Sequence, residues 1–305
     1  MVQTPAVTAI VPTHNRPELM KRAVQSILDQ KYAGDIEILV VFDACEPVLP
    51  DVTLAGNRSI RALVNGRSRG LAGGRNTGIL AARHDFVAFL DDDDYWLPEK
   101  LQQQMAAFQE HPECILVGTA MVVDDGQRKH ERLVPSDLVT HGDLLLNRLA
   151  GLHSSSFVFR RAAMLGTLGL VDEDLPRSYG EDYDLLLRTA LISPVVVVNQ
   201  PLVNVTWQGQ SYFFGQWAVY AQALEYLLLK HPQFQDSRKA VGRIESQIAF
   251  ALAASGQRIP GAKWARQAIA HDPRQVKAYL AMAIMMRLTT AAMVARTAQR
   301  FGKGI

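Results

Sequence analysis

The sequence predicts an α/β protein with a mainly parallel, mixed sheet flanked by helices and a helical C-terminal appendage. Three observations support this fold class. Short apolar runs alternate with amphipathic stretches in the first third of the chain, and the run from Phe86 stops abruptly at four aspartates, Asp91 to Asp94. From about Tyr212 onward, helical patterns continue with no clear strand. We therefore expect two domains, residues 1–210 and 211–305.

The alternation starts with an apolar run of strand composition, Val7–Val11, followed by the polar segment PTHNRP. Apolar residues at helical spacing then predict a helix up to Leu28, with a proline and a glutamate in its first turn. Further strands are predicted at Ile36–Phe42 and Ile60–Val64, and another ends at Asp91. Ligands of such sheets bind beyond the carboxyl ends of the strands, so the polar segments there should converge on one edge.

The remaining elements of the first domain are less regular. The glycines between Gly66 and Gly74 predict a flexible loop before a short helix from Arg75 to about Arg83. Another helix begins at Pro98. Four strands and two helices complete the predicted domain: strands Cys114–Val123, His153–Phe159, Val195–Val198 and Leu202–Trp207, and helices Ser136–Leu149 and from Gly180 to about Arg188.

The C-terminal region contains a segment, 247–273, with small residues at helical spacing around Gly256 and an Asp-Pro pair at its end. This pattern resembles a single tetratricopeptide-like hairpin, but solenoids need several such repeats to bury a continuous core. Residues 278–295 are apolar but interrupted by Arg287 and by two threonines, so they predict a packed helix rather than a membrane span. A basic helix lying on a membrane is left open as an alternative.

Composition describes an ordinary globular protein of 305 residues, with 48% hydrophobic and 20% charged residues. The formal net charge of +2 is too small to indicate a nucleic-acid partner. Cys45 and Cys114 lack metal-ligand spacing and fit a reducing compartment. No basic leader with a long apolar run is evident at the N-terminus, so the expected location is the cytoplasm.

The four aspartates indicate a metal and phosphate site. Adjacent carboxylates repel one another, and Mg²⁺ is typically held by one or two carboxylates together with substrate phosphates. The alternative is an acidic turn with solvated charges. Other phosphate and catalytic motifs are absent from the sequence: the loop after the first strand lacks the Rossmann glycines, and there is no Walker lysine motif, serine nucleophile elbow or His-Glu-x-x-His zinc helix.

Five segments in order carry a resemblance to a known family: IVPTHNRPELMKRAVQSIL, EILVVFD, GLAGGRNTGI, FVAFLDDDDYWLPEKL and GEDYDLLLR. Together they resemble the family 2 glycosyltransferases of the GT-A fold, over about residues 5–210. The resemblance implies a hexosyltransferase-like enzyme that moves a sugar from a nucleotide diphosphate sugar to an acceptor hydroxyl with inversion. It also implies a divalent metal, Mg²⁺ or Mn²⁺, and a place in polysaccharide or glycoconjugate biosynthesis. A UDP-sugar is the favoured donor and a saccharide or glycolipid the acceptor, with peripheral contact at the inner face of the membrane left open.

The resemblance also assigns site residues by position. Asp43 would hold the base, Arg75 would lie near the nucleotide and diphosphate, and Asp93, the last aspartate of the family's acidic motif, would bind the metal. Independently of the resemblance, Asp94 is expected to stabilise the turn, and Tyr95 and Trp96 are expected to anchor the acidic loop to the core, with sugar stacking as the alternative. The full set of expected nucleotide-sugar-binding residues is Pro12, Thr13, His14, Arg16, Asp43, Arg75, Asp91 and Asp92.

Inversion in one displacement requires a base that deprotonates the acceptor hydroxyl. The resemblance makes Asp182 this base and places Glu181 on the acceptor side. Without the resemblance, both would read as acids placed favourably in the first turn of a helix.

Two departures from the family pattern support other hypotheses. Phe42 stands where the family usually has the first of two aspartates, and Gln208 stands where a histidine near the metal is often found. These changes raise the alternative of a non-catalytic descendant that binds nucleotides or scaffolds partners through its helical tail. A third hypothesis is a nucleotidyltransferase that makes activated sugars. The chain lacks the glycine-rich, lysine-bearing N-terminal loop that is expected of such an enzyme.

Overall fold

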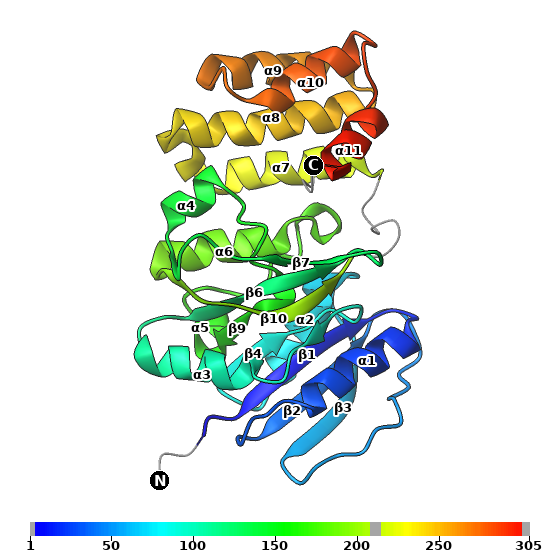
Figure 1. Ribbon diagram of the computed structural model, residues 1–305, viewed down its shortest axis with the longest axis vertical. Helices are drawn as coiled ribbons and strands as arrows, with labels where there is room; N and C mark the ends of the chain where they lie inside the picture. The colour runs from blue at the N-terminus through cyan, green and yellow to red at the C-terminus, as the bar shows by residue number, and fades with distance from the viewer. Residues whose placement is uncertain (1–3, 208–214, 301–305) are drawn as a thin grey trace. The chain divides into compact units, whose positions relative to one another are not determined.

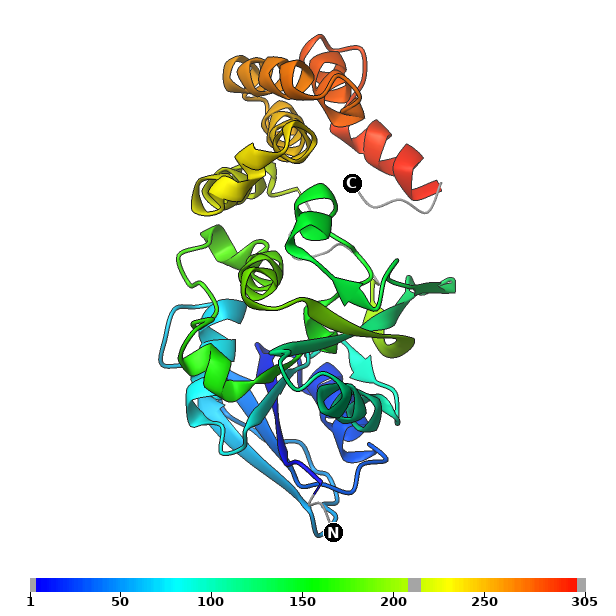
Figure 2. The same cartoon turned by 90° about the vertical axis from the view of Figure 1, so that its left-hand side faces the viewer.

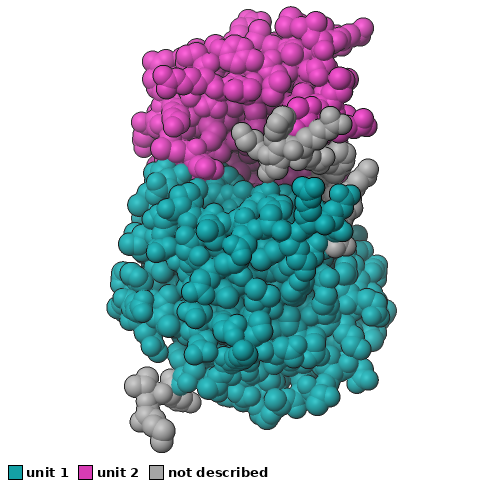
Figure 3. Space-filling model, in the orientation of Figure 1, with its two compact units in different colours: residues 1–144, 148–173, 181–211 teal, residues 145–147, 174–180, 212–305 magenta. Residues whose placement is uncertain are grey.

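The structure is a computed structural model that describes residues 4–207 and 215–300 of the chain. It separates into two compact units (Figure 3). Unit 1 comprises residues 1–144, 148–173 and 181–211, and unit 2 comprises residues 145–147, 174–180 and 212–305.

Unit 1 is built around a mixed ten-stranded sheet, which confirms the predicted fold class (Figure 1). The strand order is β3-β2-β1-β4-β9-β6-β10-β5, with β7 paired to β6 and β8 paired to β10. The strands are β1 Val7–Thr13, β2 Ile36–Phe42, β3 Arg58–Val64, β4 Phe86–Phe89, β5 Tyr95–Trp96, β6 Leu116–Asp124, β7 Lys129–Arg132, β8 Leu138–Val139, β9 Val158–Arg160 and β10 Val195–Thr206.

Strand direction explains which segments can meet. β1 runs parallel to β2 and β4, β2 runs parallel to β3, and β10 runs parallel to β6. β9 is antiparallel to both β4 and β6. The carboxyl ends of β1, β2, β3 and β4 therefore lie at one edge of the sheet, where the polar segments follow.

Helices cover both faces of this sheet (Figure 2). Apolar residues of α1 and α3 form one core with alternate residues of the strands, and α2 packs on the other face, where Gly78 lies against Ile10 of β1. The helices of unit 1 are α1 Pro17–Leu28, α2 Leu71–Ala81, α3 Lys100–Glu110, α4 His141–Leu146, α5 Arg161–Leu165 and α6 Glu181–Ile192, with a 3₁₀ turn at Ser154–Ser156.

Helix α2 begins at Leu71, so the prediction of a flexible loop up to Gly74 is wrong. A Cβ atom on Gly73 would lie 1.9 Å from the carbonyl oxygen of Ser68, and one on Gly78 would lie 2.4 Å from Ile10. The glycines thus let the helix pack closely on β1 and on the loop before it. Glycine is usually a helix breaker, and only tertiary packing reverses that expectation here.

Three other predicted elements differ in the structure. The helix predicted at 136–149 is a short strand, β8, followed by the short helix α4, and the segment from His153 begins with a 3₁₀ turn before β9. The two strands predicted between Val195 and Trp207 form one strand, β10. Its register on β6 shifts on both sides of Pro201, a residue that has no NH to donate to the ladder.

Unit 2 is helical. It contains α7 Trp217–Lys230, α8 Arg238–Ala254, α9 Arg258–His271, α10 Val276–Met285 and α11 Ala291–Arg300, with 3₁₀ turns at Pro176–Ser178 and Pro232–Asp236. Buried alanines such as Ala249, Ala265 and Ala281 form the contacts between α8, α9 and α10. Small side chains let these helices approach closely. Among the described residues, no helix has the length and apolar character needed to cross a membrane.

Candidate active site

The end of β1 and the loop that follows it lie against the acidic motif Asp91–Asp94 at the carboxyl edge of the sheet. Thr13 Oγ1 donates a hydrogen bond to Asp92 Oδ2 at 2.7 Å. A guanidinium nitrogen of Arg16 lies 3.1 Å from Asp92 Oδ1 and 3.1 Å from Asp93 Oδ2. The structure therefore brings together the polar segments that follow β1 and β4.

The acidic motif carries more negative charge than its protein partners offset. Burial raises the pKa of Asp93, and the neighbouring Asp91 and Asp92 raise it further. The pKa of Asp94 lies well above its ordinary value because the side chain is buried and Asp91 and Asp93 repel its charge. Burial also raises the pKa of Asp92, although hydrogen bonds favour its ionised form. A bound cation would favour the ionised carboxylates, so these electrostatics suit a metal site.

Asp94 and Trp96 fix the acidic motif to the core, as predicted. Asp94 Oδ2 accepts a hydrogen bond from Ser155 Oγ at 2.6 Å, and its Oδ1 accepts one from the Thr206 NH at 3.0 Å. The indole NH of Trp96 donates to the Ser155 carbonyl oxygen at 2.8 Å. The buried Lys100 Nζ lies 4.1 Å from the centre of the Trp96 ring, and burial holds the pKa of this lysine well below its ordinary value.

A set of three possible metal ligands includes Asp94 and two neighbouring side chains. Asp91, Asp94 and His153 each place one ligand atom within 4.8 Å of the other two. The Asp93 carboxylate belongs to the same motif and keeps 38% of its side-chain surface exposed. Carboxylate oxygens suit Mg²⁺ and Mn²⁺, and an imidazole nitrogen is a common ligand of transition metals. These donors fit a divalent metal, and the specific role of Asp93 as its ligand stays a prediction.

Arg75 in α2 links the acidic motif to the first turn of α6. Its side chain has no exposed surface, and its guanidinium lies 2.6 Å from Asp91 Oδ1 and 2.5 Å from Glu181 Oε1. It also donates to Ser154 Oγ at 3.0 Å. Burial disfavours charge on the guanidinium, but the two carboxylates outweigh burial and raise the Arg75 pKa. The expected contact of Arg75 with the diphosphate stays a prediction, because protein groups enclose the guanidinium here.

The Asp43 carboxylate is held by the loop that follows β3. Its Oδ1 accepts a hydrogen bond from Asn65 Nδ2 at 2.8 Å, and its Oδ2 accepts one from the Gly70 NH at 2.9 Å. His14 Nδ1 approaches the main-chain oxygen of Asp43. Gly70 has a φ of 108°, which favours glycine. Asp43 and His14 therefore meet at this edge, while their expected contacts with the nucleotide stay predictions.

Glu173 ties the same loop to α2. Its carboxylate pairs with Arg67, accepts a hydrogen bond from the Ser68 NH at 3.2 Å, and accepts another from Asn76 Nδ2 at 2.6 Å. Burial opposes the charge on Glu173, but the hydrogen bonds from these three partners outweigh it and lower the pKa to about 2. The carboxylate is thus ionised at neutral pH and holds the loop in place.

Asp182 lies in the first turn of α6, next to Glu181. Its Oδ2 forms an ion pair with Arg148, and its Oδ1 accepts a hydrogen bond from the main-chain NH of Tyr183 at 2.7 Å. Arg148 also donates to the carbonyl oxygen of Leu152 at 3.2 Å, which fixes the guanidinium. The Asp182 side chain keeps 15% of its surface exposed, so its carboxylate is accessible while its orientation is set by the protein.

Comparison with protein families connects this site to a known group of enzymes. The family model described as glycosyl transferase family 2 matches residues 8–166, more than half of the chain. The chain belongs to this family. The matched residues include all of β1 except Val7, together with Arg75 and the acidic motif, and they end before Asp182.

Several relatives in the family support the same assignment. An uncharacterized glycosyltransferase of Haemophilus influenzae is 26% identical over 66% of this chain and 68% of its own length. The Escherichia coli enzyme WfgD, described as a UDP-Glc:alpha-D-GlcNAc-diphosphoundecaprenol beta-1,3-glucosyltransferase, is 27% identical over 63% of this chain and 73% of its own. The amylovoran biosynthesis glycosyltransferase AmsE of Erwinia amylovora is 27% identical over 62% and 68%.

Solved structures share the fold. Staphylococcus aureus TarS 1–349, in complex with UDP-GlcNAc, has a TM-score of 0.53 and 16% identity, covering 98% of this chain and 92% of that one. The mannosyltransferase PcManGT of Pyrobaculum calidifontis, in complex with GDP-Man and Mn²⁺, has a TM-score of 0.57 and 18% identity, covering 98% and 85%. At these identities the likeness establishes a common fold only.

Three residues of this family member were not singled out from the sequence. Asn65 follows β3 as Asp43 follows β2, so its position after a parallel strand is a signal that could have found it. Arg148 and Glu173 lie in irregular segments, where no periodic pattern marks them. Gln208, at the position of the family's histidine, lies outside the described residues.

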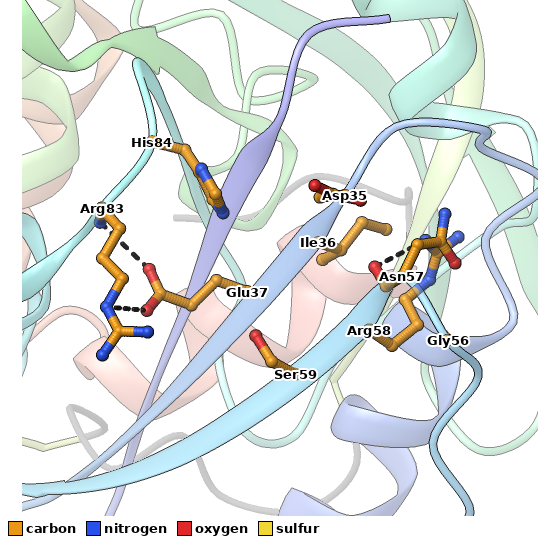
Figure 4. Close-up of a pocket in the computed structure, with 9 residues that line it drawn as sticks. All are labelled: Asp35, Ile36, Glu37, Gly56, Asn57, Arg58, Ser59, Arg83 and His84. Atoms are coloured by element: carbon orange, nitrogen blue, oxygen red, sulfur yellow. Dashed lines mark hydrogen bonds and ion pairs between the residues drawn. The ribbon is translucent and has the colours of Figure 1, made fainter.

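A hollow lies at the opposite ends of the strands from the candidate active site (Figure 4). It is lined by the starts of β2 and β3 and by Arg83 and His84. Its buried Glu37 carboxylate is 2.8 Å from Arg61 and accepts hydrogen bonds from Thr8 and from the Arg83 NH. These interactions neutralise the one buried acid of the hollow, so it is a structural ion-pair cluster.

Glu181 should make stability depend on pH. Burial raises its pKa from 4.5 to about 7, although Arg75 opposes the shift. The folded state therefore keeps a proton that the unfolded chain loses near pH 4.5, and this contribution to stability disappears as the pH rises to about 7. Urea unfolding of the wild type and Glu181→Gln across this range should show the steeper decline in the wild type. Parallel curves would contradict the assignment.

Proposed function

We propose that this chain is a metal-dependent, inverting glycosyltransferase. It transfers a sugar from a nucleotide diphosphate sugar to a hydroxyl of a saccharide or glycolipid acceptor, in polysaccharide or glycoconjugate biosynthesis. The donor we favour is a UDP-sugar. Support for this choice comes from the UDP-Glc donor of WfgD and the UDP-GlcNAc complex of TarS, whereas the PcManGT complex contains GDP-Man.

The observation that carries the proposal is the joining of two groups of carboxylates through Arg75. One group, the acidic motif with Thr13 and Arg16, lies at the carboxyl edge of the parallel strands. The other, Glu181 and Asp182, opens α6. Arg75 contacts both groups, so a donor at the first would lie near an acid at the second.

On the donor side, Asp93 would hold the metal, with Asp91 and Asp92 supporting it and the ribose. A divalent cation bound there would stabilise the negative charge that gathers on the diphosphate leaving group. Asp43 and His14 would contact the base, and Pro12, Thr13 and Arg16 would line the nucleotide. The side chains assigned to the metal offer carboxylate oxygens, which are the ligands that such a cation prefers.

On the acceptor side, Asp182 would accept the proton of the attacking hydroxyl. The ion pair with Arg148 keeps one oxygen of this carboxylate oriented. Glu181 also lies on the acceptor side, where its contact with Arg75 would position Arg75 and the first turn of α6.

Metal removal tests the donor side of the proposal. Slow hydrolysis of a nucleotide sugar should require Mg²⁺ or Mn²⁺ and stop in chelator, measured by release of the nucleoside diphosphate. Asp93→Asn should raise the metal concentration for half-maximal rate by at least about tenfold, since even partners of metal ligands typically contribute ~10- to 100-fold to affinity. Asp35→Asn, an exposed acid at the opposite ends of the strands, is the matched control.

The same assay separates the alternative of a non-catalytic descendant, which Phe42 favours because it replaces an expected aspartate. Such a protein would bind nucleotides without turnover. Metal-dependent hydrolysis above the chelated control excludes that alternative. If the protein binds nucleotides but hydrolyses no nucleotide sugar, the proposed enzymatic activity is excluded instead. A thermal-shift screen of nucleoside diphosphates and their sugars would identify the donor, because selective binding stabilises the folded state.

A further inference from the structure

Helix α10 exposes apolar side chains away from the alanines through which it packs on α8 and α9. The exposed fractions are 66% for Val276, 47% for Tyr279, 36% for Met282 and 60% for Met286. Their spacing places them along one side of the helix, which we call the α10 face. The opposite side packs through alanines against α8 and α9 and carries one partly buried lysine, Lys277. A helix with apolar side chains on both sides usually has a partner on both sides, so the α10 face indicates a missing partner.

The chain beyond α10 extends this face. Leu288 directly follows the exposed Arg287 and has 75% of its surface exposed. In α11, Met293 is 59% exposed, and the exposed Arg296 lies three residues later on the same side of that helix. Apolar and basic side chains thus alternate on the exposed surface of this segment.

The charge of the segment is strongly one-sided. Residues 274–305 contain six of the 32 lysines and arginines of the chain and none of its 30 aspartates and glutamates. The net charge of the whole chain is only +2, so the remainder of the chain is net negative. The partner of the α10 face must therefore accept apolar side chains and supply negative charge.

We propose that the α10 face, with Arg287 and Leu288, docks on an anionic lipid bilayer. A basic segment with exposed apolar side chains lies at the boundary of headgroups and acyl chains, where phosphates attract its cations. A second copy of the chain would bring the exposed Arg274, Arg287 and Arg296 of both copies together, and this repulsion disfavours self-association. A nucleic acid would offer phosphates but no apolar layer for Val276 and Met286.

The test is flotation of the full chain with vesicles of phosphatidylcholine alone or of phosphatidylcholine with phosphatidylglycerol. The wild type should float only with the anionic vesicles, and less as salt rises. Arg287→Glu with Leu288→Ser should weaken this binding by about tenfold or more, since a single basic residue near the surface contributes roughly fivefold. Arg258→Glu with Ile259→Ser, an adjacent exposed cation and apolar residue at the start of α9, should leave binding unchanged.

The proposal is overturned if the wild type floats with neither vesicle, floats equally with both, or loses binding equally in the two double variants. Light scattering measures the oligomeric state and so tests self-association. If the wild type is a dimer and only the Arg287→Glu/Leu288→Ser variant is a monomer, this face is an interface between copies and the membrane proposal is overturned. The flotation measurement needs no nucleotide sugar, so its result does not depend on whether the proposed glycosyltransferase activity is found.

Discussion

Asp182→Asn should lower the rate of sugar transfer by about 10²- to 10⁴-fold, the usual contribution of a positioned general base. Asparagine keeps the shape of the side chain and can still contact Arg148, but it cannot take the proton of the acceptor hydroxyl. Because the acidic motif is unchanged, nucleotide-sugar affinity should stay nearly the same. Transfer assays and calorimetry of donor binding measure the two effects separately.

Asp236→Asn is a suitable control for this substitution, because Asp236 is an exposed acid of unit 2. It should retain full transfer. If the Asp182→Asn variant transfers sugar at the full rate, Asp182 is not the base. A joint loss of transfer and donor binding would instead indicate that Asp182 shapes the donor site.

Above about pH 7, where Glu181 is ionised, Arg75→Met should cost about 3–5 kcal/mol of folding free energy, because it leaves Asp91 and Glu181 without their shared buried cation. Methionine retains much of the volume, so the loss is mainly electrostatic. Urea unfolding measures it. Adding Glu181→Gln to Arg75→Met should recover part of the loss, since one of the two uncompensated charges is then absent.

Lys31→Met removes one partner of an exposed ion pair with Glu99 and serves as the comparison. Its effect should be small, because exposed pairs contribute little. Equal losses in Arg75→Met and Lys31→Met would contradict the view that Arg75 holds the two halves of the site together.

The alternation of strands and helices could be predicted from the sequence because strands and helices differ in the spacing of their apolar residues. The register of β1 against β2 and β4 then follows from topology, and so does the meeting of Thr13 with Asp92. The glycines of α2 could not be interpreted this way. Their helical state depends on the close approach to Ile10 and Ser68, which only the folded chain reveals.

The partners of the site residues were harder to predict than the residues themselves. Asp182 belongs to a recognisable segment, but Arg148 reaches it from 34 positions away, through an irregular stretch. Arg75 is marked by its position after the glycines, yet nothing in the local sequence shows that it is fully buried between Asp91 and Glu181. Long-range pairing of charges leaves no periodic trace in the chain.

The contacts of Glu173 determine where this chain can be cut and rejoined with a relative in a chimeric enzyme. An exchange that ends at residue 166, where the family match ends, would combine Arg67 and Asn76 of one parent with residue 173 of the other. The loop that holds Asp43 would then lose its matched carboxylate. A working exchange has to transfer residues 65–76 and 171–173 as one block, although about a hundred residues separate them.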